Sequence, residues 1–222
     1  MCNYTQITES ENFVMNEIVK IINCMAGRYQ PRQIFQDWIK MFALSMSNSF
    51  YFDNKLENEY LDIAKKYTND QLNMFSEMSA RLVMLFDEEI SDYLGEIYMM
   101  LGASSVKTAQ FFTPFHVSEI MAESMLTKWD RKKIILSEPT VGGGANILAI
   151  AKGLQKRKID YQDMMIVTAQ DLDYNCFYMA YVQFNLCGIP AKVIQGNTLA
   201  EEKNETLCTM MWYVKGCELC EG

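Results

Sequence analysis

At residues 134–146 the sequence reads IILSEPTVGGGAN. This segment begins as an apolar strand, passes through a glycine-rich turn and continues into the apolar helical pattern of Ile147, Leu148, Ala151 and Leu154. Consecutive glycines allow a backbone to approach a ligand closely, because no side chain intervenes. Open α/β folds bind their ligands at such a position, beyond the carboxyl ends of the strands. The segment therefore indicates either a ligand-binding turn or an ordinary glycine-rich loop.

Strand and helix patterns alternate around this turn in the second half of the chain. Strands are expected at residues 133–137, 164–169 and 191–195, with helices at 145–157 and 174–187 between them. Such alternation predicts a parallel sheet with right-handed crossovers. Three strands leave an exposed edge, so we expect the residues around Trp212 or a second chain to cover it.

The first half of the chain has a purely helical pattern. Apolar residues recur at helical spacing over residues 11–26, 31–44, 55–67, 70–86 and 88–101. The period changes near residues 102–105, so we expect a helical domain at residues 1–105 and a second domain at residues 106–222.

The charge of the chain is unevenly distributed. The 222 residues have a net charge of -8, and residues 1–105 hold 15 acidic but only 8 basic side chains. Nucleic-acid phosphates bind to cationic surfaces, so the acidic first half is excluded as the main surface of that kind. Basic clusters at residues 128–133 and 152–158 are candidate nucleic-acid contacts, although clusters of this kind are commonly solvated helix ends.

The apolar runs, the first residues and the cysteines of the sequence favour a cytoplasmic protein without membrane contact. No apolar run approaches the roughly 18 residues of a membrane span, and the first residues do not resemble a secretory signal. Seven scattered cysteines argue against a disulfide framework and for a reducing compartment. Cys217 and Cys220 have the spacing of half a zinc site, but no second pair accompanies them, so a frayed tail is favoured over a metal site.

Polar side chains follow the second and third expected strands. Asp171 ends the second strand, where a carboxylate can accept the ribose hydroxyls of an adenosine-containing cofactor; the alternative is a helix N-cap, a role that Asp173 fills equally well. Asn197 follows the third strand and could reach an adenine edge, or could simply form a turn. The glycine turn lacks the Gly-Lys-Thr/Ser of a Walker loop, and Ile147 occupies the third glycine position of G-x-G-x-x-G. S-adenosylmethionine has no phosphates and needs neither device.

Several segments also resemble, in order, the motifs of N-6 adenine DNA methylases, in particular the modification subunits of type I restriction systems. Residues 109–114, AQFFTP, with Ser118, Met121 and Ala122, are similar to the family's Q-F-F/Y-T-P motif. Residues 138–144, EPTVGGG, are similar to its first motif, with Val141 in place of the usual small residue or cysteine. Asp171 stands at the acidic ribose-binding position, GNTL at 196–199 resembles the third motif, and DYLGEIY at 92–98 resembles the segment that precedes the cofactor domain.

This resemblance implies an α/β fold in which an N-terminal helical domain precedes a partial Rossmann-like S-adenosylmethionine-dependent methyltransferase domain, truncated after its third strand. It implies S-adenosylmethionine as the cofactor, with the Thr-Pro segment holding the methionine part. The cofactor-binding residues that it implies are Phe112, Thr113, Pro114, Glu138, Pro139, Thr140, Gly142, Gly143, Gly144, Asp171, Leu172 and Asn197.

One departure from the family concerns catalysis. The catalytic tetrad N/D-P-P-Y/F/W is missing, since the four prolines, Pro31, Pro114, Pro139 and Pro190, never adjoin. No catalytic residue is therefore assigned. We expect an adenine-specific DNA methyltransferase that needs a partner or further sequence, with DNA bound directly or through a partner subunit, and with a homo-oligomer or a restriction-modification protein as the assembly. The alternative is a noncatalytic, degenerate methylase that senses cofactor or acts as an interaction module in a restriction-modification or phage-defence complex. A small-molecule or RNA methyltransferase is a third reading.

Overall fold

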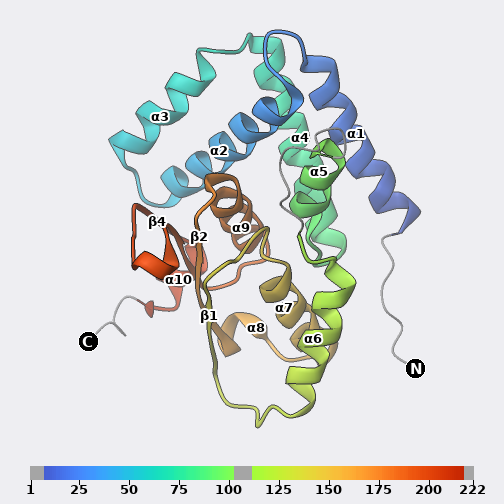
Figure 1. Ribbon diagram of the computed structural model, residues 1–222, viewed down its shortest axis with the longest axis vertical. Coiled ribbons are helices and arrows are strands. Elements are labelled where there is room, and N and C mark those ends of the chain that lie inside the picture. Colours follow the sequence, from blue (N-terminus) through green and yellow to red (C-terminus); the bar gives the residue numbers. More distant parts are fainter. Residues whose placement is uncertain (1–7, 103–111, 218–222) are drawn as a thin grey trace. The chain divides into compact units, whose positions relative to one another are not determined.

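The chain folds into two compact units in a computed structural model that describes residues 8–102 and 112–217 (Figure 1). One unit comprises Met1–Glu89 and Tyr93–Phe112, and the other Ile90–Asp92 and Thr113–Gly222. The expected boundary at residues 105 and 106 lies outside the described residues, as do Gln110, Phe111 and Cys220. Within the described ranges, no helix combines the length and the apolar character needed to cross a membrane.

Among the residues that the structure describes, the first unit contains only helices. They are α1 (Glu9–Met25), α2 (Pro31–Phe50), α3 (Asn54–Ala64), α4 (Asn69–Glu88) and α5 (Tyr93–Gly102). Capping boxes begin α1 and α4, where Thr8 and Thr68 accept the N–H of the third helical residue, and Pro31 begins α2 with its fixed φ. The helical patterns in the sequence thus predicted this half correctly. In α5, however, the helix begins five residues later than the pattern suggested.

Buried polar side chains join these helices. The Tyr93 hydroxyl donates to Glu11 Oε1 at 2.5 Å, and the Tyr67 hydroxyl donates to Asp37 Oδ2 at 2.8 Å. Each carboxylate is almost fully buried, with 3% of Glu11 and 5% of Asp37 exposed. Burial of an ion is costly unless hydrogen bonds compensate for the lost water, so these pairs fix how α1 meets α5 and how α2 meets the start of α4.

The second unit alternates helices and strands. Its elements are α6 (Phe115–Thr127), β1 (Ile134–Glu138), α7 (Ala145–Lys156), α8 (Tyr161–Met164), β2 (Met165–Asp171), α9 (Tyr174–Leu186), β3 (Ala191–Gln195), the 3₁₀ helix η1 (Thr198–Ala200), β4 (Glu205–Cys208) and α10 (Met210–Val214). The sheet has the order β1-β2-β3-β4, and α9 packs on β2 and β3 while α6 packs on α7 (Figure 1). β1, β2 and β3 are parallel, as predicted, so their carboxyl ends share one edge.

The sheet differs from the sequence-based prediction in one strand. A sheet of three parallel strands was expected, but β4 adds a fourth strand antiparallel to β3, so the sheet is mixed. The chain reverses after Gly196, where a Cβ would collide with the Glu202 carbonyl, and the Asn204 N–H donates back to the Gln195 carbonyl at 2.9 Å. The edge of β3 is thereby paired, and α10, with the buried Trp212, packs against the same strand. The sequence of β4, Glu-Thr-Leu-Cys, does not alternate between apolar and polar residues, so no strand pattern reveals it.

Ion pairs join α6 to α7 and involve most of the basic side chains of the cluster at residues 152–158. Lys152 and Lys156 lie 3.3 Å and 3.2 Å from Glu119 Oε1. Arg157 donates to Glu123 at 2.6 Å. These three cations are already paired with the acidic side chains of α6, so they serve helix packing rather than a free phosphate-binding surface.

Candidate functional site

The glycine turn lies between β1 and α7, at the edge where the parallel strands end. Gly142 and Gly144 have φ angles of 56° and 104°, and Gly144 is the N-cap of α7. Two backbone hydrogen bonds of 2.9 Å close the turn, from Gly144 N to the Val141 carbonyl and from Val141 N to the Gln170 carbonyl beside the end of β2. The turn is therefore a defined structure tied to the neighbouring strand, not a loose loop.

Packing beneath the turn explains two of its glycines without any ligand. A Cβ on Gly143 would stand 2.6 Å from Asp92 Oδ1, and a Cβ on Gly144 would stand 2.7 Å from Cε1 of the Phe184 ring. Both distances are far below van der Waals contact. In addition, the left-handed backbone at Gly144 disfavours any side chain. Gly143 and Gly144 thus reflect close approach of the protein to itself, a cause that the sequence pattern could not separate from close approach of a ligand.

Asp171 holds the turn from the neighbouring strand. Its Oδ2 accepts the Gly142 N–H and its Oδ1 accepts the Asp173 N–H, both at 2.9 Å. Asp173, and not Asp171, caps α9 by accepting the Asn175 N–H at 2.7 Å. Each carboxylate oxygen can accept two hydrogen bonds, so Asp171, which is partly exposed, retains one acceptor position on each oxygen.

Glu138 is linked through α7 to α6. Asn146 Nδ2 donates to Glu138 Oε2 at 3.3 Å, and Asn146 Oδ1 accepts from the Ser118 hydroxyl at 2.8 Å. Glu138 Oε1 also accepts the Thr140 N–H at 3.4 Å. Thr113 and Pro114, both exposed, immediately precede α6, so this chain of contacts ties the first turn of α6 to the end of β1.

The loop after β3 folds back over the strand ends. Asn197 Oδ1 accepts the N–H groups of Leu199 and Ala200 at 3.0 Å and 3.4 Å, and so caps η1. The Thr198 hydroxyl donates to the Pro139 carbonyl at 2.8 Å, which joins this loop to the one after β1. The side-chain oxygen of Asn197 thus caps η1, and the side-chain NH₂ group is the part that a ligand could use.

Exposed apolar side chains border this edge. Leu172 is 64% exposed and Leu199 is 99% exposed, next to the polar groups of Asp171 and Asn197. An apolar surface beside hydrogen-bonding groups suits a flat heterocycle, which needs both.

The structure brings most of the sequence-predicted residues to this edge, namely Glu138, Pro139, Thr140, Gly142, Gly143, Gly144, Asp171, Leu172 and Asn197. Thr113 and Pro114 belong to the same unit. Phe112 belongs to the helical unit, where its ring lies 5.3 Å from that of Tyr98. Sequence reasoning missed Gln183 and did not give Asp92 a role in the turn, because nothing in their spacing places them beneath it.

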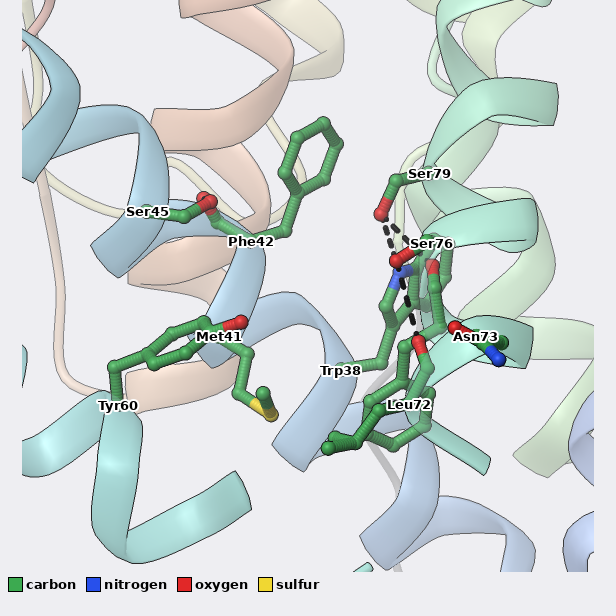
Figure 2. A pocket seen from close by; sticks show the side chains of 10 residues that line it. Trp38, Met41, Phe42, Ser45, Tyr60, Leu72, Asn73, Ser76 and Ser79 are labelled. Carbon is green, nitrogen blue, oxygen red and sulfur yellow. Dashed lines mark hydrogen bonds between the residues drawn. The ribbon is translucent and has the colours of Figure 1, made fainter. Parts of the chain in front are cut away.

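A pocket of about 320 Å³ lies in the helical unit (Figure 2). Its lining is aromatic, hydroxylic and uncharged, and comes from α2, α3 and α4, with the Trp38 indole donating to the Ser79 hydroxyl at 2.9 Å. Within residues 8–102 and 112–217, no three His, Cys, Asp or Glu side chains gather as metal ligands.

Comparisons with known proteins add a family. A family model described as N-6 DNA Methylase matches residues 89–214. One similar solved structure is a type I restriction-modification system methyltransferase subunit from Streptococcus thermophilus, 13% identical, with a TM-score of 0.46 over 89% of this chain. Another, described as a class I S-adenosylmethionine-dependent methyltransferase from Listeria monocytogenes, is 15% identical, with a TM-score of 0.43 over 77% of this chain. The present chain spans 60% and 55% of the lengths of these two proteins. No curated protein sequence matches it.

Proposed function

Because this chain belongs to the N-6 DNA methylase family, we propose that its α/β unit binds S-adenosylmethionine at the shared edge of β1, β2 and β3 and serves methyl transfer to adenine in DNA. The observation that carries this proposal is the position of Asp171. Asp171 is the last residue of β2, its carboxylate accepts the Gly142 N–H, and each of its oxygens keeps one further acceptor position.

The residues present fit the proposed cofactor. The two remaining acceptor positions of Asp171 match the two hydroxyls of a ribose. Leu172 and Leu199 offer apolar surface to an adenine ring, and the amide of Asn197 offers donors to its edge. Glu138, held by Asn146 and exposed in part, supplies a negative group for the amino end of the methionine. Thr113 and Pro114, at the start of α6, would border that end.

S-adenosylmethionine, when bound, supplies an electrophilic methyl group that an attacking amine takes by direct displacement, with release of a neutral thioether and a proton from the amine. The family binds the target adenine after it is extruded from the duplex, since the amine is out of reach inside the stack. The sequence lacks the N/D-P-P-Y/F/W tetrad for that step. We therefore propose that further sequence or a partner subunit supplies the adenine-binding side chains.

The second candidate function, a noncatalytic module that binds cofactor within a restriction-modification or phage-defence complex, rests on the same missing tetrad. In that case the α/β unit binds S-adenosylmethionine but the chain transfers no methyl group. The two candidates share the cofactor site and differ only in chemistry.

Calorimetric titration with S-adenosylmethionine tests the shared site. Asp171→Ala should weaken binding at least about tenfold, because it removes a charged acceptor. Asp173→Ala is the matched control: it removes the cap of α9 and about 1 kcal/mol of stability, but none of the proposed ligand contacts. Absence of binding to the wild-type chain, or equal affinity of wild type and Asp171→Ala, would contradict the proposal.

Transfer of a radiolabelled methyl group separates the two candidates. Purified chain is incubated with labelled cofactor and duplex DNA, alone and with the other proteins encoded beside its gene. Label in adenine identifies an enzyme, whereas binding without label in either mixture identifies the noncatalytic module.

A further inference from the structure

The glycine turn is held from below by a buried side-chain amide. Gln183 of α9 donates from Nε2 to the Gly143 carbonyl at 2.6 Å and to Asp92 Oδ1 at 2.8 Å. The Gln183 side chain is fully buried, and Asp92 is only 3% exposed. Both donor positions of the amide are therefore used, one on the turn and one on a carboxylate from a distant part of the sequence.

These contacts fix the orientation of one peptide group. In the peptide between Gly143 and Gly144, the carbonyl accepts a hydrogen bond from Gln183 Nε2 and the N–H donates to the Val141 carbonyl. A peptide made by two glycines rotates easily unless both ends are bonded, because glycine has a wide choice of φ and ψ. With both ends bonded, the neighbouring Gly142 N–H also keeps the direction in which it meets Asp171.

Asp92 fixes the amide in turn. A buried carboxylate is costly without donors, so it holds the Gln183 Nε2 group in place and sets which end of the amide faces the turn. Asp92 also occupies the space into which a side chain at position 143 would extend. It comes from Ile90–Asp92, the short segment before α5 that packs within the α/β unit.

We infer that Asp92 and Gln183 are positioning residues that hold the Gly142–Gly144 turn in the conformation that binds the cofactor, although neither side chain touches the cofactor itself. This inference rests on the proposed function for its consequence in binding. Its claim about the turn stands on the hydrogen bonds alone, so the two can fail separately.

Two nearly isosteric variants of Gln183 test the inference. Gln183→Glu replaces the donor by an acceptor that faces the Gly143 carbonyl and Asp92, and Gln183→Met keeps the length and burial but donates nothing. Calorimetric titration with S-adenosylmethionine should show a Kd raised at least about tenfold for both, since the buried Gly143 carbonyl loses its donor and the turn is no longer held. Val182→Ala, a buried neighbour on the same helix, controls for loss of stability and should keep the Kd within about threefold.

Amide hydrogen exchange of peptides that span residues 140–148 supplies a readout that needs no cofactor. Exchange within the turn should quicken in both Gln183 variants but not in Val182→Ala, even where thermal stability falls equally. Unchanged exchange in the Gln183 variants overturns the inference. If the wild-type chain shows no calorimetric binding, the proposed function fails, and the exchange result still decides whether the turn is held in this way.

A double variant separates the contact with the turn from the contact with the carboxylate. In Asp92→Asn with Gln183→Glu, the new amide donates to the new carboxylate, which restores that pair but leaves the Gly143 carbonyl without its donor. Stability should recover in part relative to Gln183→Glu, while the Kd remains raised. Full recovery of affinity would show that the bond to Gly143 is dispensable and would overturn the inference.

Discussion

Gly144→Ala is the substitution for which the structure sets the clearest cost. Gly144 has a φ of 104°, and its added Cβ would stand 2.7 Å and 2.9 Å from two atoms of the Phe184 ring. The left-handed backbone costs a residue with a side chain about 1–2 kcal/mol. Overpacking a core position costs a further ~1–3 kcal/mol, because the fully buried ring can move only by displacing its neighbours. We therefore expect a loss of about 2–5 kcal/mol in the free energy of unfolding, since the two costs arise from different atoms.

Chemical and thermal denaturation, followed by circular dichroism and tryptophan fluorescence, measure this loss. The α/β unit should unfold first, and its midpoint temperature should fall by about 4 °C for each kcal/mol lost. Trp212 reports on that unit, and Trp38, buried in the helical unit, should respond less. Gly27→Ala is the matched control, because no atom lies within 4 Å of its Cβ position and its φ is not left-handed. It should change stability by less than about 1 kcal/mol.

A double-mutant cycle identifies the cause of the loss. Phe184→Leu removes the ring atoms that the new Cβ would meet, so Gly144→Ala in that background should cost only the backbone term of about 1–2 kcal/mol. An equal cost in both backgrounds would refute the argument from ring packing. A cost below about 1 kcal/mol in the wild-type background would refute the backbone argument as well.

Three further results are expected from the electrostatics and burial of the α/β unit. Burial raises the pKa of Tyr161 to about 12. The neutral hydroxyl therefore contributes fully to the free energy of unfolding below the unfolded pKa of 10.0, and this contribution is lost as the pH rises towards 12. Unfolding titrations should show that Tyr161→Phe, which also loses the hydrogen bond to the Cys187 carbonyl, lacks this alkaline loss. The hydrogen bond from Arg157 lowers the pKa of Glu123 below its usual value of 4.5. The ion pair therefore contributes to the free energy of unfolding above pH 4.5, and this contribution is lost as the pH falls below that value. Glu123→Gln should reduce the loss of stability at acid pH by less than about 1 kcal/mol, and an unchanged acid loss would show that the pair contributes nothing. Burial also raises the pKa of the Cys187 thiol, so alkylation followed by mass spectrometry should label the exposed Cys24 well before Cys187, and equal rates would contradict the burial.

The elements follow closely from local sequence. The apolar period and its change near residues 102–105 predicted the helical half, the three parallel strands and the helices at 145–157 and 174–187 between them. The structure adds the caps at Thr8 and Thr68 that begin α1 and α4. These features act between residues close in sequence, where spacing alone specifies geometry. β4 was missed because a strand of four residues is recognised only by the partner that it finds, here β3.

The candidate site divides in the same way. The sequence alone determined which polar residues end the parallel strands, because parallel strands bring those ends to one edge. Tertiary structure assigned their tasks: Asp171 holds the Gly142 N–H while Asp173 caps α9, and Asn197 caps η1.

The glycines of the turn show the limit most clearly. Their spacing in the sequence indicated that something comes close to the backbone, but the neighbours that do so are Asp92 and Phe184, one far before the turn and the other some 40 residues after it. Contacts between distant residues depend on how helices and strands pack, which no local pattern encodes. The sequence thus determined most of the elements and the chemistry at the strand ends, and only the packing of α9 and of Ile90–Asp92 beneath the turn decided why glycines stand at positions 143 and 144.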